Sequence, residues 1–424
     1  METETIKRVI RDQEAETESK FRNEAIIPRE YTSEIEKYMA KANAIIITGV
    51  RRSGKSTAAM LLAKGKRYAR INFDDPSLEG MGAKDLIKIT EAVQDLKGDV
   101  DYIILNEIQN IKGWELYVSR LRETKRVIVT GSNSELMSEE LGSRLTGRHL
   151  SFTTFPFSFR EFLVYKKFQP DIYLTRDIVH ARKLFDEYAL EGGFPEASLF
   201  GSRFLVQIYD DVLTKDIGRR FNVKYRETFR ELSKYLVSNI SKEMSYTKLK
   251  DIFKIKSIHT VKNYISFLEK AYIIFKIDKY SGKLKQQMQS GKKVYCVDTG
   301  MSNALGFRTA EERGRMLENI VAIDLLRRKF YWNAGYEIYY WQDYRQNEVD
   351  FVVKEGSSVK QLIQVAYRVD AYDTKAREIR ALLSASKELK CNKLLVVTYD
   401  YEGKETVDGR NINFIPAWKW LIEI

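Results

Sequence analysis

The stretch Gly-Val-Arg-Arg-Ser-Gly-Lys-Ser-Thr, residues 49–57, follows the apolar run 44–47 with one threonine between them. It fits the pattern Gly-x-x-x-x-Gly-Lys-Ser at a predicted strand-to-helix junction, which is typical of a phosphate-binding loop. Gly49 and Gly54 permit the tight turn that lets successive backbone N–H groups surround phosphates, and the following helix directs its positive dipole end at them. The stretch therefore predicts binding of a nucleoside triphosphate.

The positions of this loop have expected roles in binding ATP and Mg²⁺. Lys55 is expected to reach the β- and γ-phosphates, and the Ser56 hydroxyl to ligate Mg²⁺. Side chains at Arg51 and Arg52 usually point outward, so solvent and a binding partner are equally open for them. The predicted nucleotide-binding residues are Gly49, Arg51, Arg52, Ser53, Gly54, Lys55, Ser56 and Thr57.

Strand and helix signals alternate over the first 160 residues, which predicts an α/β fold, a P-loop core with a parallel sheet covered by helices. The expected strands are Ala44–Thr48, Arg67–Phe73, Asp101–Leu105, Arg126–Thr130 and His149–Thr153. The expected helices begin near Lys55, Ala83, Trp114 and Ser134.

The third predicted strand ends in Asn106-Glu107, where P-loop ATPases with an extra central strand carry an acidic pair. In such a pair the first acid holds a Mg²⁺-bound water, and the second is the general base that polarises the attacking water. Glu107 fits the base. Asn106 can accept a hydrogen bond from a metal-bound water but brings no negative charge, so slow hydrolysis or weaker Mg²⁺ binding is expected.

Polar residues beyond the fourth predicted strand are candidates for contact with the γ-phosphate. Asn133 is the first candidate to orient the attacking water, and Ser132 is the second. Arg144 and Arg148 bracket a loop from which a guanidinium could reach the γ-phosphate in the same subunit or in a neighbour, within a homo-oligomer. The alternative for both is an ordinary surface arginine.

Further runs of the sequence resemble those of archaeal and bacterial AAA-type ATPases that carry a conserved carboxyl-terminal domain of unknown function. The matching runs are residues 45–57, 106–115, 130–136, 145–148, 155–162, 191–196 and 348–353. The similarity spans nearly the whole chain. It implies an ATPase module, a helical lid, a winged helix and a restriction-endonuclease-like α/β domain, with the usual acid at position 106 replaced.

Four domains are expected from these patterns. Residues 1–160 form the predicted ATPase domain, and residues 161–240, with apolar residues at helical spacing, form the predicted lid. Residues 241–300 form the predicted winged helix, and residues 301–424 the predicted PD-(D/E)xK nuclease-like domain.

The third of these domains is rich in lysine. Thirteen lysines, no arginine and five acidic residues stand between Ser241 and Gly300, in a chain of net charge +12. Ser245 and Ser257 are positioned to cap two helices in a helix-turn-helix pattern, followed by two predicted strands around a basic wing. Such a surface favours DNA, bound mainly through phosphate contacts, although a protein-docking platform is the alternative. The expected DNA-contacting residues are His259, Lys262, Lys283, Lys285, Lys292 and Lys293.

The last domain carries acidic residues in the order of a nuclease site. Glu318 on a predicted helix, with Asp350 and Gln364 on predicted strands, would hold Mg²⁺ through oxygen ligands. The lysine that such sites carry two residues further on is Ala366 here. A nuclease fold without cleavage is therefore the leading interpretation.

Composition excludes several other classes of protein. Only two cysteines occur, Cys296 and Cys391, so a disulfide framework is not expected. The longest apolar runs are shorter than the roughly 20 residues of a membrane-spanning helix. We therefore expect a protein of the reducing cytoplasm without a membrane partner.

Together these patterns predict an ATPase whose ATP hydrolysis is coupled to DNA binding or remodelling. Two alternatives stay open. One is a nucleotide-gated, Mg²⁺-dependent nuclease, and the other is an ATP-dependent signalling or protein-assembly switch.

Overall fold

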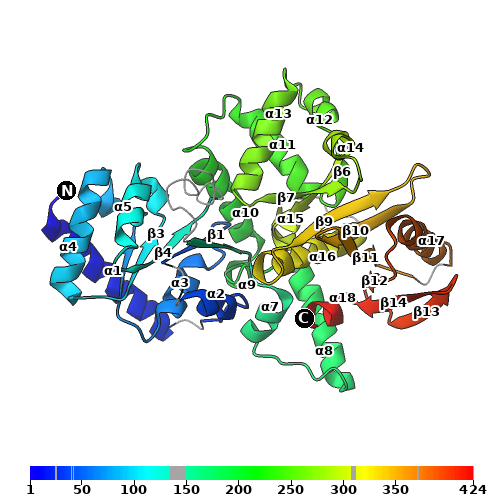
Figure 1. Ribbon diagram of the computed structural model, residues 1–424, viewed down its shortest axis with the longest axis horizontal. Coiled ribbons are helices and arrows are strands. Elements are labelled where there is room, and N and C mark those ends of the chain that lie inside the picture. The colour runs from blue at the N-terminus through cyan, green and yellow to red at the C-terminus, as the bar shows by residue number, and fades with distance from the viewer. Residues whose placement is uncertain are drawn as a thin grey trace. The chain divides into compact units, whose positions relative to one another are not determined.

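The computed structural model describes residues 1–23, 26–39, 41, 43–133, 149–306, 312–369 and 372–423. The chain divides into two compact units, Met1–Phe155 and Pro156–Ile424, and each contains its own β-sheet (Figure 1). The finer division of the second unit into lid, winged helix and nuclease-like domain stays a prediction.

The first unit is built on a five-stranded parallel sheet, which confirms the predicted α/β core. Its strands are β1 (Ala44–Gly49), β2 (Tyr68–Asn72), β3 (Tyr102–Asn106), β4 (Arg126–Gly131) and β5 (His149–Thr154). The strand order is β2-β3-β4-β1-β5, so β4 lies between β1 and β3. Every residue of β1 is buried, as expected for a central strand covered on both faces.

The helices of the first unit follow most of the predicted starts. They are α2 (Thr32–Met39), α3 (Lys55–Ala63), α4 (Leu86–Lys97) and α5 (Trp114–Leu121), with short 3-10 turns η1 (Pro76–Leu78), η2 (Ala83–Asp85) and η3 (Ile108–Asn110). The helix expected near Ala83 opens with the 3-10 turn and continues as α4. The helix expected near Ser134 lies outside the described residues.

One long helix of the first unit was not predicted. Helix α1 (Thr3–Asn23) is rich in charged residues, but Ile6, Val9, Ile10 and Gln13 lie on one buried face. This i, i+3, i+4, i+7 spacing is the signal that identifies it. The face packs on α4 and β2 and joins the hydrophobic core beside the sheet.

The second unit begins with helices, as the sequence predicts for residues 161–240. They are α7 (Phe159–Tyr165), α8 (Thr175–Glu191), α9 (Ala197–Phe200), α10 (Ser202–Asp211), a π-helical turn η5 (Val212–Ile217) and α11 (Arg226–Ser238). Gly192 ends α8 with a positive φ of 80°, and Gly193 packs so closely on Phe157 that a side chain there would clash with its carbonyl oxygen. The glycine pair therefore terminates the helix, as expected.

A nine-stranded mixed sheet runs through the rest of the second unit. Its strands are β6 (Lys242–Met244), β7 (Ile274–Lys279), β8 (Lys292–Cys296), β9 (Tyr336–Gln342), β10 (Glu348–Glu355), β11 (Ser358–Ala366), β12 (Leu394–Thr398), β13 (Gly403–Val407) and β14 (Arg410–Pro416). The strand order is β13-β14-β12-β11-β10-β9-β7-β8-β6. Because β7 pairs with β9, the predicted boundary at residue 300 falls within one continuous sheet.

Helices flank this sheet (Figure 1). They are α12 (Tyr246–Ile252), α13 (Ile258–Lys270), α14 (Leu284–Gln289), α15 (Thr299–Leu305), α16 (Glu312–Tyr331), α17 (Tyr372–Leu389) and α18 (Ala417–Ile422). The pair α12 and α13 matches the predicted helix-turn-helix. Ser257 caps α13 by accepting from the His259 N–H, whereas Ser245 precedes α12 without a side-chain cap.

Replacing Ile10 in α1 with alanine tests whether this helix belongs to the core. Ile10 is 1% exposed, so Ile10→Ala is expected to lower the free energy of unfolding by about 2–5 kcal/mol. The neighbouring, exposed Arg11 supplies the control, and Arg11→Ala is expected to change it by less than about 0.5 kcal/mol. Urea denaturation of both variants measures the difference, and equal stabilities would contradict the packing of α1.

Candidate functional site

The loop between β1 and α3 needs glycine at both ends. Gly49 has a φ of 143°, and a Cβ atom there would lie 2.0 Å from the carbonyl oxygen of Thr154 in β5. Gly54 has a φ of 87° and is the N-cap residue of α3. A side chain is excluded at Gly49 and strained at Gly54, and the two glycines bring the loop backbone to the N-terminus of α3, where anions bind.

Lysine and arginine side chains brace this loop. Lys55 is buried at the start of α3, and its Nζ donates to the Val50 carbonyl at 2.9 Å. Arg29 is also buried and donates from Nη1 to the Ser53 carbonyl and from Nη2 to the Phe155 carbonyl, each at 2.6 Å. Arg29 was missed in the sequence, because no local motif marks an arginine that acts through contacts 24 and 126 residues away.

Glu107 and Ser132 meet at the carboxyl ends of β3 and β4. Glu107 adopts a left-handed conformation (φ 54°), and its N–H donates to the Thr130 carbonyl at 2.8 Å. Its carboxylate accepts from the Ser132 N–H and hydroxyl, each at 3.4 Å, and from the Gln109 amide. The structure therefore brings together Glu107 and the residues 132–133 at the edge that also carries the loop, where ligands of such sheets bind.

Asn106 faces an arginine from the neighbouring strand. With its amide oriented to satisfy both ends, its oxygen accepts from Arg70 Nε at 2.8 Å and its nitrogen donates to Thr130 Oγ1 at 2.9 Å. Arg70 also donates from Nη1 to Thr17 of α1 at 2.7 Å. The Asn106 oxygen, which was expected to accept from a Mg²⁺-bound water, thus accepts from the Arg70 guanidinium. The sequence did not indicate this partner.

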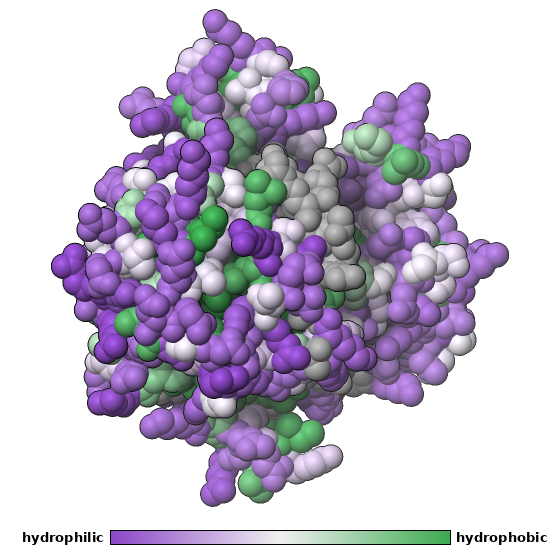
Figure 2. All heavy atoms as spheres, turned by 60° about the vertical axis from the view of Figure 1, so that its left-hand side comes forward, coloured by the Kyte–Doolittle hydropathy of each residue, from purple (hydrophilic) through white to green (hydrophobic). Residues whose placement is uncertain are grey.

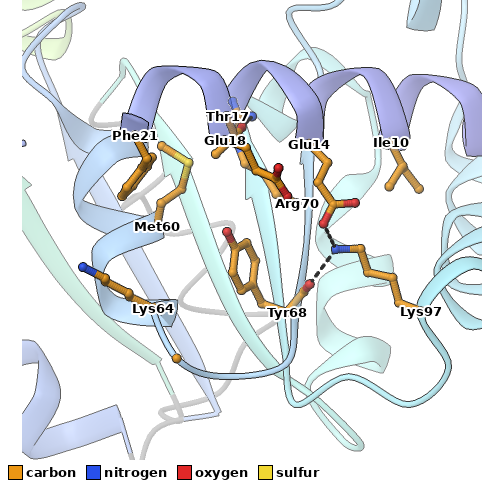
Figure 3. Close-up of a pocket in the computed structure, with 11 residues that line it drawn as sticks. Ile10, Glu14, Thr17, Glu18, Phe21, Met60, Lys64, Tyr68, Arg70 and Lys97 are labelled. Atoms are coloured by element: carbon orange, nitrogen blue, oxygen red, sulfur yellow. Dashed lines mark hydrogen bonds and ion pairs between the residues drawn. The ribbon is translucent and has the colours of Figure 1, made fainter. Parts of the chain in front are cut away.

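A cavity of about 240 Å³ lies beside Arg70, between α1, β2 and α3 (Figure 3). The lining residues are Ile10, Glu14, Thr17, Glu18, Phe21, Met60, Lys64, Gly65, Tyr68, Arg70 and Lys97. Figure 3 shows Lys97 bound to Glu14 and to the Tyr68 carbonyl at this cavity. No residue of the loop 49–54 is among the lining residues, so this cavity is distinct from the phosphate edge.

The remaining predicted residues of the nucleotide site are placed as follows. Asn133 is buried at the end of β4, and Ser56 and Thr57 are half-buried in the first turn of α3. Arg51 is half-buried with its Nη1 3.8 Å from Asp74 Oδ2, whereas Arg52 is exposed and has a positive φ of 64°. Arg144 and Arg148 lie outside the described residues.

In the second unit, the predicted nuclease residues surround a lysine. Lys293 of β8 is 3% exposed, and its Nζ lies 2.9 Å from Glu318 and 3.0 Å from Asp350. Gln364 accepts from the Asp350 N–H at 3.3 Å and donates to Glu378 at 2.6 Å. Because an ammonium fills the centre of the acidic residues, the cluster does not fit a Mg²⁺ ion. In the described part of the chain, no group of three or more His, Cys, Asp or Glu side chains is arranged to hold a metal.

Two of the expected DNA contacts are therefore wrong. Lys293 is sequestered by carboxylates, and Lys292 is 8% exposed, with its Nζ 2.9 Å from Asp278 and 2.8 Å from the Gln287 carbonyl. Both lie in β8, where contacts with other strands and with α14 and α16 keep their ammonium groups from solvent. The lysines that remain exposed on α12, α13, their turn and the wing are Lys248, Lys254, Lys256, Lys262, Lys283 and Lys285, called here the exposed lysine set.

Other expectations concern the chain as a whole. Cys296 and Cys391 are buried free thiols. No helix in the described ranges has the length and apolar composition to cross a membrane. The face shown in Figure 2 is covered mainly by hydrophilic side chains, with hydrophobic ones in small separate groups.

Comparison with protein families matches three segments of the chain. Residues 41–163 match the family described as an AAA domain. This segment includes the loop, Asn106 and Glu107. Residues 182–312 and 313–420 match two domains of unknown function, DUF8612 and DUF4143.

Relatives are found in archaea and bacteria. The uncharacterised protein MJ1544 of Methanocaldococcus jannaschii is 31% identical over 397 residues, which cover 89% of this chain and 88% of that protein. An uncharacterised protein of Haemophilus influenzae is 28% identical, over 93% of this chain and 99% of its own length. Among solved structures, the Walker-type ATPase of Pyrococcus abyssi is 12% identical with a TM-score of 0.43, over 66% of this chain and 96% of that one.

The chain carries an AAA-type P-loop domain in its first unit, and its likeness to MJ1544 extends through both units. It belongs to the same family as MJ1544.

Proposed function

We propose that the chain binds ATP with Mg²⁺, hydrolyses it, and couples this cycle to DNA binding or remodelling. The observation that carries the ATPase part is the single sheet edge that holds the loop, Lys55 and Glu107 together. The loop amides and the N-terminus of α3 would bind the phosphates, and Lys55 would neutralise their charge. Bound Mg²⁺, held through Ser56, would stabilise the charge that develops on the transferred phosphoryl group.

Glu107 is the proposed general base. Glu107 follows β3, which is separated from β1 by β4 alone, and its carboxylate lies beside the Ser132 N–H. Asn133 follows Ser132 at the same edge of the sheet. A base at this point would polarise a water for attack on the γ-phosphate, and Asn133 would orient it. Asn106 would contribute a neutral oxygen, which is already engaged with Arg70.

The DNA part of the proposal is supported by the exposed lysine set. Four of its members lie on the helix-turn-helix and two in the wing segment between β7 and β8. His259 and Asn263 are exposed on α13 with their side chains 3.3 Å apart, and the Lys262 ammonium lies 5.4 Å from the centre of the Tyr246 ring. Lysines spread over a helix and a wing would neutralise phosphates without selecting a sequence.

A protein-assembly switch is the second candidate, because the wing also exposes apolar side chains. Leu284 and Met288 of α14 are each 71% exposed, beside Lys283 and Lys285. Such side chains beside lysines would give a docked protein both apolar and charged contacts. DNA binding and its salt dependence distinguish the two candidates.

Two substitutions separate ATP binding from turnover. Lys55→Ala is expected to abolish detectable heat on titration with Mg·ATP, because the phosphates lose their charge partner. Glu107→Gln is expected to retain binding and to lower kcat about a hundredfold or more, as loss of a general base does. Calorimetry and phosphate release on the same preparations measure both, and unchanged binding in Lys55→Ala would refute the site.

The pairing of Asn106 with Arg70 predicts a dependence between these positions. Asn106→Asp alone is expected to change the Mg²⁺ concentration for half-maximal turnover less than about threefold, since Arg70 would pair with the new carboxylate. The double variant Asn106→Asp, Arg70→Gln is expected to lower the Mg²⁺ concentration for half-maximal turnover about tenfold, since the new carboxylate is then available to the metal. Arg70→Gln alone is the control. Equal effects of Asn106→Asp with and without Arg70 would contradict the pairing.

Reversing charge on α13 and on the turn before it tests the DNA surface. Lys256→Glu with Lys262→Glu is expected to weaken duplex binding more than about tenfold and to reduce the salt slope by about 2, since two phosphate contacts are lost. Lys387→Glu with Lys404→Glu, which reverses two exposed lysines elsewhere in the second unit, is the matched control. Fluorescence anisotropy at several salt concentrations measures both. Wild-type protein without salt-dependent DNA binding would favour the protein-assembly switch.

A further inference from the structure

The acidic cluster of the second unit holds a cation that the chain itself supplies. The Lys293 ammonium lies 2.7 Å from Glu348 Oε1, 2.9 Å from Glu318 Oε1 and 3.0 Å from Asp350 Oδ1. An ammonium has three N–H donors, and three carboxylates surround this one. Each N–H donor of Lys293 therefore has a carboxylate within ion-pair distance.

The carboxylates are held in place by further hydrogen bonds. The Tyr295 hydroxyl donates to Glu318 Oε1 at 2.8 Å, and the Val365 N–H donates to Asp350 Oδ2 at 2.9 Å. The Gln342 amide donates to Glu348 Oε2 at 3.4 Å. The carboxylates around Lys293 are therefore held by hydrogen bonds from three different strands, β8, β9 and β11.

The charges also agree with a permanent cation. Burial by itself lowers the pKa of Lys293, but the carboxylates of Glu318 and Asp350 outweigh this and raise it well above its ordinary value. Lys293 therefore stays charged across the physiological pH range. Burial raises the pKa of Glu318, and the neighbouring Lys293 ammonium acts in the opposite direction.

We propose that the Lys293 ammonium replaces the divalent metal of a nuclease-like site. It leaves the acidic cluster without room for a catalytic ion and joins β8, next to the helix-turn-helix, to α16 and β10. The residue that excludes the metal thus comes from the lysine-rich segment and not from the strand that carries Gln364. This inference does not depend on ATP binding or on DNA binding by the exposed lysine set.

The distances predict which ion would bind if the ammonium were removed. The three oxygens stand 2.7–3.0 Å from the cation centre. Ca²⁺ binds oxygen at about 2.3–2.6 Å with flexible geometry, whereas Mg²⁺ demands about 2.0–2.1 Å. Lys293→Ala is therefore expected to create a site that prefers Ca²⁺ over Mg²⁺.

Thermal unfolding of the full chain with CaCl₂ or MgCl₂ provides the test. Lys293→Ala is expected to melt below wild type without Ca²⁺ and to gain about 5 °C at a hundredfold excess of Ca²⁺ over its dissociation constant. Wild type is expected to show no gain in melting temperature with Ca²⁺. The double variant Lys293→Ala, Asp350→Asn is expected to lose the gain that Lys293→Ala shows. Lys292→Ala is the matched control, since it removes the adjacent buried ammonium, whose carboxylate partner Asp278 lies outside the cluster.

Three results would overturn the proposal. The first is folded Lys293→Ala that gains no stability from Ca²⁺, and the second is wild type stabilised by Ca²⁺ in a way that Asp350→Asn abolishes. The third is metal-dependent DNA cleavage by wild type that Lys293→Ala abolishes, which would make Lys293 the lysine of an active nuclease.

An insoluble Lys293→Ala protein would still be informative. Lys293→Ser, refolded from denaturant with and without Ca²⁺, is then compared by yield of folded protein. A higher yield in Ca²⁺ supports the proposal, and equal yields in both conditions overturn it.

Discussion

The close approach of β5 to the end of β1 is the constraint on which the nucleotide edge depends. A side-chain atom at Gly49 would lie 2.0 Å from the Thr154 carbonyl oxygen, so the backbone can pass only where that atom is missing. Arg29 then binds the carbonyls of Ser53 and Phe155, one in the loop and one just after β5. The loop is thus fixed from two directions, and its N–H groups are ordered before any phosphate arrives, which lowers the cost of binding.

The same edge shows how one departure from an expected motif is accommodated. Asn106 replaces an acid, and its amide oxygen accepts from Arg70, which itself reaches Thr17 on α1. The half-buried guanidinium loses part of its hydration, and burial lowers its pKa below the ordinary value. The interaction therefore links the amino-terminal helix and its adjacent cavity to the residue beside the proposed base, through a continuous chain of hydrogen bonds.

Buried cations have different partners in the two units. Arg29 donates to backbone carbonyl oxygens, so it orders the loop and leaves the acidic side chains of the site available for other partners. Lys293 is satisfied by Glu318, Glu348 and Asp350, so it occupies the very groups that a metal would need. Buried charges require partners in both cases, and the chemistry left to each site depends on which partners are used.

Local patterns were enough to predict the loop, the five strands of the first sheet, the helix-turn-helix pair, two strands around the wing and the strands that carry Asp350 and Gln364. These features follow from local spacing, since glycine, capping residues and apolar periodicity act within a few residues of each other. Helix α1 carried the same kind of signal, in Ile6, Val9 and Ile10, beneath a charged composition. The contact between Arg70 and Asn106 and the burial of Lys292 and Lys293 arise only when the chain folds. These contacts join different elements of the fold, and a lysine in a basic stretch gives no local sign of the carboxylates that the sheet and α16 bring around it.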